Sequence, residues 1–359
     1  MKLLFSHTPR KQSMKSKFSQ RSYDFLDNSN WGIAHEVRSI LQDWSNDFNP
    51  DNDFLSSFKT EEHFQSQFFE LFIWKYFTAL GFSIDKSDRD VLTTIPDFLC
   101  ADGQSNFFIE CTTVKFRQEQ IKNKILDTIE NMALPSIWFS INFRKSSNRV
   151  PSLKRIREEI NFQLSQSSDS FEFNNNDWII KFRTYPKNEK MTTNVFSIYG
   201  GNSKNDGFLN LQNSLQKKAK MNYDINSKPF ILAVNTNDVF LKDEEFLKIL
   251  YGKVEGNQSN LQPTREDSLF LSKGDLPKNR HISAVLICNN LTPWHMDSCK
   301  ISLWHNPNAN IPFSSPSGLC DSVTIKENDK LMMTRKEGIH PSTHINLTPN
   351  YYLKSKLPV

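Results

Sequence analysis

The sequence lacks the long apolar runs, the paired cysteines and the phosphate-binding glycine loops that mark several large classes of protein. Its longest apolar runs, such as 230–234, are far shorter than the roughly 20 residues of a membrane-spanning helix. The five cysteines are odd in number, widely spaced and without a Cys-x-x-Cys pair, so we expect core thiols rather than a disulfide framework or a zinc ribbon. Neither a Walker-type loop nor a dinucleotide-binding glycine motif occurs, which leaves nucleotide binding unsupported.

An excess of one charge is also missing from most of the chain. The formal net charge is +4, from 44 basic and 40 acidic side chains, but six of the basic residues lie within residues 1–22, which contain no acid. The remainder has 38 basic and 40 acidic side chains, a net charge of −2. This balance excludes a uniformly basic nucleic-acid coat and leaves room for a local basic groove.

The beginning of the chain differs from the rest in composition. Residues 1–25 are polar, basic and rich in Ser, Gln and Lys, which predicts a flexible basic arm. The apolar start at 1–5 is too short for a secretory signal. We therefore expect a soluble cytoplasmic protein with reduced cysteines and no membrane partner.

What the chain does contain is ample apolar material in alternating helix and strand patterns. Hydrophobic residues make up 37% of the sequence, and 29 residues are phenylalanine, which is enough to bury a large core. Helices are expected at 32–48, 60–81, 118–131, 152–166, 209–223 and 244–251, and strands at 96–101, 106–114, 136–143, 178–185, 195–199, 229–235, 281–288 and 300–304. This alternation predicts an α/β fold.

The same patterns predict one main domain with additions. The α/β domain is expected over 26–313, beginning with helices and carrying an insertion at about 135–205. The polar stretch 252–280 is too long for a simple connection and is expected to form a surface excursion or a lid. The end of the chain, 314–359, is expected to be a loop-rich peripheral segment.

Two carboxylates, Asp97 and Glu110, lie on neighbouring strands of a predicted β-hairpin. Their positions are symmetric about the turn at 102–105, so their Cβ atoms should be about 5 Å apart, or about 7–8 Å apart if the turn changes by one residue. Carboxylates held this close repel unless one is protonated or a cation bridges them. A hard divalent ion such as Mg²⁺ suits such oxygen ligands. Taken singly, each acid is more often a strand-start residue or a member of an ion pair.

A third acid, Glu70, lies on the apolar helix predicted at 60–81. Its neighbours one and two turns further on are apolar, and the other charge between 68 and 80, Lys75, is about 140° away around the helix. An isolated buried carboxylate is costly. We therefore expect Glu70 to meet a partner from elsewhere in the fold.

These residues carry a resemblance to a known superfamily. A helix with Glu70, then Pro96-Asp97-Phe98, then 108–112 (Phe-Ile-Glu-Cys-Thr) resembles the PD-(D/E)XK nucleases, which have a restriction-endonuclease-like fold. The match covers about 61–114. It implies a mixed β-sheet flanked by helices, with Asp97 and Glu110 as ligands of Mg²⁺ or Mn²⁺ and Glu70 as an auxiliary acid at the metal.

A wider resemblance covers most of residues 31–313. Five segments are similar to landmarks of an uncharacterised group of bacterial proteins within or near that superfamily, namely 67–71, 109–112, 228–235, 282–286 and 306–309. This likeness implies the fold more strongly than it implies an activity.

The sequence departs from the superfamily at one position. The superfamily places a lysine two residues after the second acid to help activate the attacking water, and this sequence has Thr112 there. A threonine shares the face of Glu110 but brings no positive charge to a developing phosphorane, and it is equally well explained as a plain β-former.

A lysine from another position is the expected substitute, unless catalysis is lost. The lysines considered are Lys115, Lys122, Lys124, Lys217, Lys218 and Lys220. We favour Lys218, on the helix that precedes the strand at 229–235. A solvated helix face is the ordinary explanation for lysines of this kind.

These observations lead to one hypothesis and two alternatives. The hypothesis is a metal-dependent DNA endonuclease or phosphodiesterase, with Asp97, Glu110, Thr112 and Lys218 as catalytic candidates and Glu70, Asp97 and Glu110 as metal ligands. The first alternative is a catalytically inactive module on the same fold that binds nucleic acid or protein. The second is a different enzyme on that fold, because fold does not determine function. DNA is the expected partner, and a homodimer or partner proteins of a defence system are considered with it.

Overall fold

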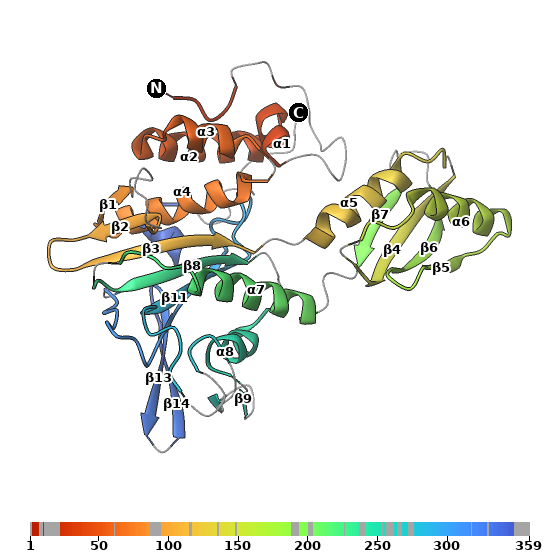
Figure 1. The fold of residues 1–359 in the computed structure, drawn as a ribbon. Helices are drawn as coiled ribbons and strands as arrows, with labels where there is room; N and C mark the ends of the chain where they lie inside the picture. The colour runs from red at the N-terminus through yellow and green to blue at the C-terminus, as the bar shows by residue number, and fades with distance from the viewer. Residues whose placement is uncertain are drawn as a thin grey trace. The chain divides into compact units, whose positions relative to one another are not determined.

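The computed structural model describes residues 2–6, 10, 22–60, 62–86, 95–114, 117–134, 136–147, 149–187, 194–199, 204–225, 227–236, 241–252, 254–255, 262–263, 268–271, 276–316, 318–328 and 330–347. The chain divides into two compact units (Figure 1). The first is formed by Arg21–Val114 and Phe208–Val359 with the N-terminal residues up to Met14, and the second mainly by Lys115–Gly207. The second unit therefore begins earlier than the insertion expected at about 135–205.

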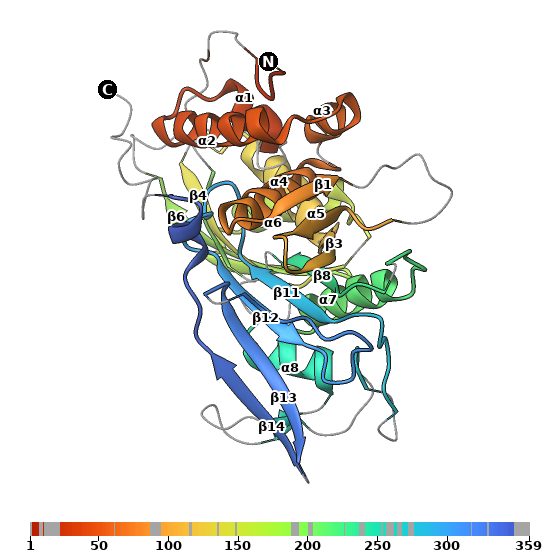
Figure 2. The ribbon, with the colours of Figure 1, turned by 90° about the vertical axis from the view of Figure 1, so that its left-hand side faces the viewer.

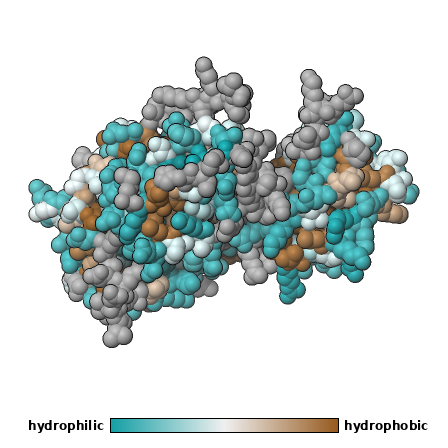
Figure 3. All heavy atoms as spheres, turned by 90° about the horizontal axis from the view of Figure 1, so that it is seen from above, coloured by the Kyte–Doolittle hydropathy of each residue, from teal (hydrophilic) through white to brown (hydrophobic). Residues whose placement is uncertain are grey.

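No helix in the described part of the chain is long and apolar enough to cross a membrane. In the space-filling view of Figure 3, hydrophobic residues form separate brown patches between hydrophilic teal areas. The large hydrophobic side chains that are exposed include Trp31 in the first unit and Phe162 in the second.

The first unit is built on a mixed sheet of eight strands. In spatial order these are β1 (Ser83–Lys86), β2 (Phe98–Ala101), β3 (Asn106–Thr113), β8 (Phe230–Thr236), β11 (Ala284–Asn289), β12 (Lys300–His305), β13 (Asp321–Asn328) and β14 (Lys330–Lys336). Strands β1, β2 and β3 form an antiparallel meander, and β3, β8 and β11 run parallel. Strand β12 is antiparallel to β11 and parallel to β13, and β14 is antiparallel to β13.

Helices cover both faces of this sheet. One face carries α1 (Ser22–Asn28), α2 (Gly32–Phe48), α3 (Asn52–Phe58) and α4 (Phe64–Ala79), and the other carries α7 (Lys204–Ala219) and α8 (Asp243–Tyr251). The view in Figure 2 shows the two helical layers on either side of the strands. The short α9 (Pro341–His344) contacts α4. The α/β prediction is confirmed in its coarse form, a mixed sheet flanked by helices.

The central elements of the first unit are the most apolar parts of the sequence. Helix α4 buries ten of its sixteen residues, because it lies between α2 and α3 on one side and β3 on the other. Strand β8 is buried at all seven positions, since parallel strands flank it and helices cover both of its faces. The helix predicted at 32–48 and the buried strand predicted at 229–235 are confirmed by α2 and β8.

The second unit has a four-stranded sheet of its own. The strand order is β5 (Ser170–Asn174), β6 (Ile179–Pro186), β4 (Ile137–Lys145) and β7 (Val195–Tyr199), antiparallel except for the β4–β7 pair. Helices α5 (Arg117–Glu130) and α6 (Leu153–Ser165) supply isoleucines that pack against the inward-facing phenylalanines of the sheet. This unit therefore has a separate hydrophobic core.

The structure adds elements that the sequence patterns do not predict. Helix α3 occupies the stretch between the first two predicted helices, where the Asp51 side chain caps it by accepting the backbone N–H of Phe54 at 2.6 Å. Strands β1 and β5 are also additional, and both are short. Two-residue strands β9 (Val254–Glu255) and β10 (Gln262–Pro263) pair within the stretch 252–280.

The expectation of a surface excursion at 252–280 is wrong for part of that stretch. Leu269 and Phe270 are buried. Their backbone N–H groups donate to the carbonyl oxygens of Ile249 and Leu250 at 2.9 and 3.0 Å. These bonds satisfy carbonyl groups near the end of α8, which a helix cannot satisfy internally.

The expectation of a loop-rich, peripheral C-terminal segment at 314–359 is also wrong for its described residues. Strands β13 and β14 form a seven-pair antiparallel hairpin that continues the main sheet beyond β12. Val323 and Ile325 on β13 are buried. The segment is therefore part of the fold of the first unit.

The expectation of a flexible basic arm at 1–25 is wrong for its described residues. Leu4 and Phe5 are buried, and the Leu4 backbone N–H donates to the Gln42 side chain at 2.9 Å. The Tyr23 hydroxyl on α1 donates to the Leu4 carbonyl oxygen at 2.9 Å. The parts of the arm at 7–9 and 11–21 lie outside the described residues.

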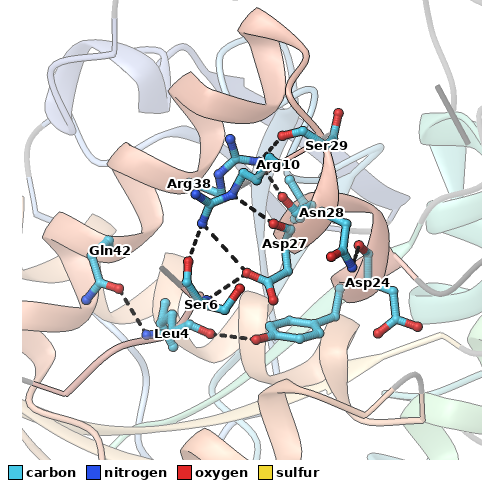
Figure 4. Close-up of polar contacts among 11 residues, drawn as sticks. Leu4, Ser6, Arg10, Asp24, Asp27, Asn28, Ser29, Arg38 and Gln42 are labelled. Carbon is cyan, nitrogen blue, oxygen red and sulfur yellow. Dashed lines mark hydrogen bonds and ion pairs between the residues drawn. The ribbon is translucent and has the colours of Figure 1, made fainter. Parts of the chain in front are cut away.

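Two arginines hold the chain where this segment meets α1 and α2 (Figure 4). Arg10 donates to the Asp27 carbonyl oxygen at 2.8 Å and lies 3.8 Å from the Asp27 carboxylate. Arg38 on α2 is buried and donates to the carbonyl oxygens of Leu26 and Ser29. Burial, and then the charge of Arg10, lower the pKa of Arg38 to about 10, and Asp27 opposes this shift.

Replacing Arg38 by methionine is expected to lower the free energy of unfolding by about 1–2 kcal/mol, because two buried carbonyl oxygens lose their donor. Urea unfolding measures the change. The matched control Lys59→Met removes an exposed cation from the same unit and should cost less than about 0.5 kcal/mol. Equal stability of the two variants would contradict the role of Arg38.

Candidate functional site

The hairpin of β2 and β3 positions the two predicted carboxylates. Phe98 pairs with Ile109, so the register predicted from the turn is confirmed. Continuing that register by one residue places Asp97 opposite Glu110. The two acids are therefore cross-strand neighbours at the point where β2 begins.

The turn residues explain why this register forms. The Asp102 carboxylate accepts the backbone N–H groups of Gln104 and Ser105 at 2.9 and 2.7 Å. Gly103 adopts a φ of +82°, a left-handed conformation that residues with a Cβ rarely adopt. These local bonds close the four-residue loop and align the strands.

Asp97 and Glu110 lie in different surroundings. Asp97 is half-buried, and its Oδ2 accepts the backbone N–H of Cys111 at 2.8 Å, which ties the carboxylate to β3. Ile109 and Cys111 belong to the core that α4 covers, so Glu110 alternates to the opposite face, which α7 covers. Glu110 is only 4% exposed.

Lys218 meets Glu110 directly. It lies in the last turn of α7, and its Nζ forms a short ion pair with Glu110 Oε1. The contact arises because α7 leads into β8, which runs parallel to and beside β3. Lys217 and Lys220 are exposed, so of the three lysines at this helix end the structure brings Lys218 to the carboxylate.

The other lysines considered from the sequence lie elsewhere. Lys122 is buried within the second unit, with its Nζ 5.6 Å from the centre of the Phe143 ring. Lys124, on the same helix of that unit, is exposed. Lys115 lies outside the described residues.

The charges at this site are unevenly balanced. Burial, and then the negative charge of Asp97, raise the pKa of Glu110 to about 7, although Lys218 and Tyr223 work in the opposite direction. Burial alone would lower the pKa of Lys218, but the charges of Glu110 and Asp97 outweigh it and leave this pKa above its ordinary value. The ammonium group therefore stays charged at neutral pH, while repulsion between the carboxylates persists.

Tyr223 is a member of the site that the sequence patterns miss. Its hydroxyl donates to Met221 Sδ at 3.2 Å, and burial followed by the charge of Glu110 raises the pKa of Tyr223 well above its usual range. The ring of Tyr223 packs 5.1 Å from that of Phe230 at the start of β8. Tyr223 follows Lys218 by five residues, and both precede β8. This position is the signal in the sequence that could have identified it.

Glu70 lies on α4, on the other side of β3. It is half-buried, and its Oε1 accepts a hydrogen bond from Gln67 Nε2 at 3.3 Å. The pKa of the buried Cys111 thiol is raised by burial and then by the negative charges of Asp97, Glu70 and Glu110. The three predicted acids thus lie within electrostatic range of one thiol. Lys75 pairs with Asp47 at 3.7 Å instead.

Thr112 occupies the expected place on β3. It pairs with Val234 on β8 and is half-buried. It shares the face of Glu110 by the two-residue period of the strand, but its side chain is uncharged. The positive charge beside Glu110 comes from Lys218 instead.

The structure brings two of the three predicted acids together, because Asp97 and Glu110 are cross-strand neighbours and Glu70 lies on the other side of β3. In the part of the chain that the structure describes, no group of three or more His, Cys, Asp or Glu side chains is arranged to hold a metal ion. Glu70 is therefore not gathered with Asp97 and Glu110 into one ligand set. Mg²⁺ commonly uses one or two carboxylates with water and substrate phosphate, so two carboxylates are enough for the ion that the sequence predicts.

Comparisons of the chain with protein-family models, with curated proteins and with solved structures found no match. The arrangement of Asp97, Glu110 and Lys218 therefore carries the functional interpretation.

Proposed function

We propose that this protein is a metal-dependent DNA endonuclease or phosphodiesterase with a restriction-endonuclease-like fold. The observation that carries the proposal is the ion pair between Lys218 and Glu110, which sets an ammonium group beside the carboxylate that faces Asp97. This is the charge that the PD-(D/E)XK pattern takes from a lysine at the position of Thr112. A lysine from α7 replaces it because β8 follows α7 and lies beside β3.

The order of the elements supports the same fold. Helix α4 carries Glu70, Asp97 directly precedes β2, and Glu110 lies on β3 of a mixed sheet. This is the helix, strand and strand order in which the superfamily places its acids. Helices on both faces of the sheet agree with that architecture.

Each residue has a distinct part in the proposed reaction. Asp97 and Glu110 would hold Mg²⁺ or Mn²⁺, which as a Lewis acid lowers the pKa of bound water and offsets charge on a phosphate. Lys218 keeps its positive charge at neutral pH and stabilises the negative charge that develops on the phosphoryl oxygens during attack by water. Tyr223 lies near Glu110, whose charge acts on it, but its hydroxyl donates to Met221, so Tyr223 has no step in the reaction.

Cleavage of supercoiled plasmid and of labelled single-stranded and duplex oligonucleotides tests the proposal. The wild type is expected to cut with Mg²⁺ or Mn²⁺ and not with a chelator. Asp97→Ala should abolish cutting, because it removes one of the two carboxylates. The matched control Asp53→Ala removes an exposed acid from α3 and should cut like the wild type.

A second candidate function is the catalytically inactive binding module. The observation that favours it is that Lys218 already neutralises part of the charge of Glu110 without a metal, while Thr112 supplies none. An inert wild type together with metal-dependent cutting by Thr112→Lys would establish this alternative for the natural protein. Cutting by the wild type that Asp97→Ala leaves unchanged would contradict the site itself.

A further inference from the structure

The sheet of the second unit has one face packed on helices and one face that displays polar and aromatic side chains. Along β6, Ile180 and Phe182 are fully buried, whereas Arg183 and Tyr185 are exposed and Lys181 is half-buried. The buried residues belong to the core with α5 and α6. By the two-residue period of a strand, the exposed ones share the opposite face.

The same alternation holds on the strands beside β6. On β5, Phe171 and Phe173 are buried and Glu172 is exposed. On β4, Phe139 is buried, and the half-buried Trp138 alternates to the face of Tyr185. We call this surface the open face, formed by Trp138, Ser140, Asn142, Arg144, Ser170, Glu172, Asn174, Ile179, Lys181, Arg183 and Tyr185.

The register arranges the open face in rows. Trp138 and Tyr185 are directly paired across β4 and β6, which makes an aromatic pair at one end. The next rows along β6 hold Arg183 and Lys181, paired on β4 with small or amide side chains. Directly paired side chains have Cβ atoms about 5 Å apart, so the aromatic pair and the two cations form one continuous strip.

The strip is basic, and so is the unit that carries it. Among the described residues of the open face, Glu172 is the one acid; it lies opposite Lys181 and 3.6 Å from Arg144, so the three cations Arg144, Lys181 and Arg183 exceed the acid by two charges. Over residues 115–207 the sequence has 15 basic and 10 acidic side chains, a net charge of +5 in a chain whose total is +4. Residues 115–207 and the stretch 1–22 are therefore both basic, and the rest of the chain has an excess of acidic side chains.

We propose that the open face binds single-stranded nucleic acid, a function that goes beyond the proposed cleavage site in the first unit. Tyr185 and Trp138 stack on bases, and Lys181 and Arg183 contact the phosphates that follow along the strand. Aromatic side chains on the open face of a four-stranded sheet are a known means of stacking unpaired bases. Duplex bases are stacked inside the helix and do not offer their faces to such a strip, so the strip selects single strands.

Fluorescence anisotropy with the full chain in a chelator tests the proposal without cleavage. The probes are a labelled oligothymidylate, an oligouridylate and a duplex of equal length. Tyr185→Ala is expected to raise the Kd for the single strands about tenfold, because one stacking contact is lost. The double variant Lys181→Ala/Arg183→Ala should reduce the slope of log K against log salt concentration by about 1.4.

The helix on the other face of the sheet provides matched controls. Phe162→Ala removes an exposed aromatic ring from α6, and Lys154→Ala/Arg157→Ala removes two exposed cations from it. Both controls should bind like the wild type. Thermal unfolding of every variant checks that the second unit remains folded.

The outcomes separate this proposal from the proposed nuclease. The proposal is supported if either single-stranded probe binds more tightly than the duplex and if Tyr185→Ala and the double variant weaken that binding. This holds whether or not the protein cuts plasmid. Duplex binding as tight as single-strand binding, or single-strand binding that both sets of variants leave unchanged, would overturn it. The absence of binding to either single-stranded probe would also overturn the proposal. One such case is an open face that joins two copies of the chain instead.

Discussion

Lys218→Ala is expected to slow DNA cleavage by about 10² or more, because it removes the one ammonium group beside Glu110 in the described structure. Divalent-cation binding should be retained or become tighter, since the cation no longer competes with Lys218 for the carboxylate. The two effects are measured by plasmid nicking and by calorimetry. A fall in cleavage with unimpaired metal binding distinguishes a charge acting on the phosphate from a residue needed only to hold the site together.

Two neighbouring lysines serve as matched controls for this change. Lys217→Ala and Lys220→Ala remove the same charge from exposed positions one and two residues away, about 100° and 200° around the helix. Both variants should cut at nearly the wild-type rate. If Lys218→Ala also cuts at that rate, the assignment of the migrated lysine is wrong, and the metal alone must activate the water.

Glu110→Gln is expected to change how stability depends on pH. Relative to the wild type, the variant should gain about 2 kcal/mol of unfolding free energy as the pH is raised from about 5 to about 8. The change is measured by urea unfolding at the two pH values without divalent cations. It corresponds to roughly 30-fold in the unfolding equilibrium.

The sign follows from the raised pKa of Glu110. This pKa is about 7 in the folded protein and 4.5 in its ordinary state, because burial and the charge of Asp97 disfavour the carboxylate. Between these values the folded state binds a proton that the unfolded state does not, which stabilises the fold. The contribution is complete below about pH 4.5 and is lost as the pH rises through 7. Glutamine does not titrate, so the variant does not undergo this loss.

The exposed Glu62 on the same unit provides the control for this measurement. Glu62→Gln should follow the pH dependence of the wild type. Added Mg²⁺ should raise the melting temperature of the wild type at pH 8 more than that of Glu110→Gln, because a ligand that binds only the folded state stabilises it. A Glu110→Gln variant with the same pH dependence as the wild type would contradict the strained carboxylate pair.

Much of the fold was predictable from local patterns. The amphipathic spacing over 32–48 and the unbroken apolar run before Asn235 correspond to α2 and β8, because burial on one or both sides leaves a direct trace in the sequence. The additions were harder to predict. β1 and the C-terminal strands β13 and β14 form against the edges of existing sheets, so their stability depends on partners distant in the chain rather than on their own composition.

The N-terminal segment illustrates the same limit. Its composition is that of a disordered arm, yet Leu4 and Phe5 are buried against α2 and its neighbours. Two apolar residues in a basic stretch carry no periodicity. Their burial depends on a surface that exists only after α1, α2 and α3 have assembled.

The sequence by itself determined that Asp97 and Glu110 face each other, because the register of a hairpin depends on the turn between its strands and on the two-residue period. Only the tertiary structure decided which cation meets them. Lys218 lies 108 residues from Glu110, and its contact requires both the crossover that sets β8 beside β3 and the rotation of α7 that leaves Lys217 and Lys220 exposed. Helical periodicity places three lysines near one helix end, but it does not specify which side of that helix the sheet will cover.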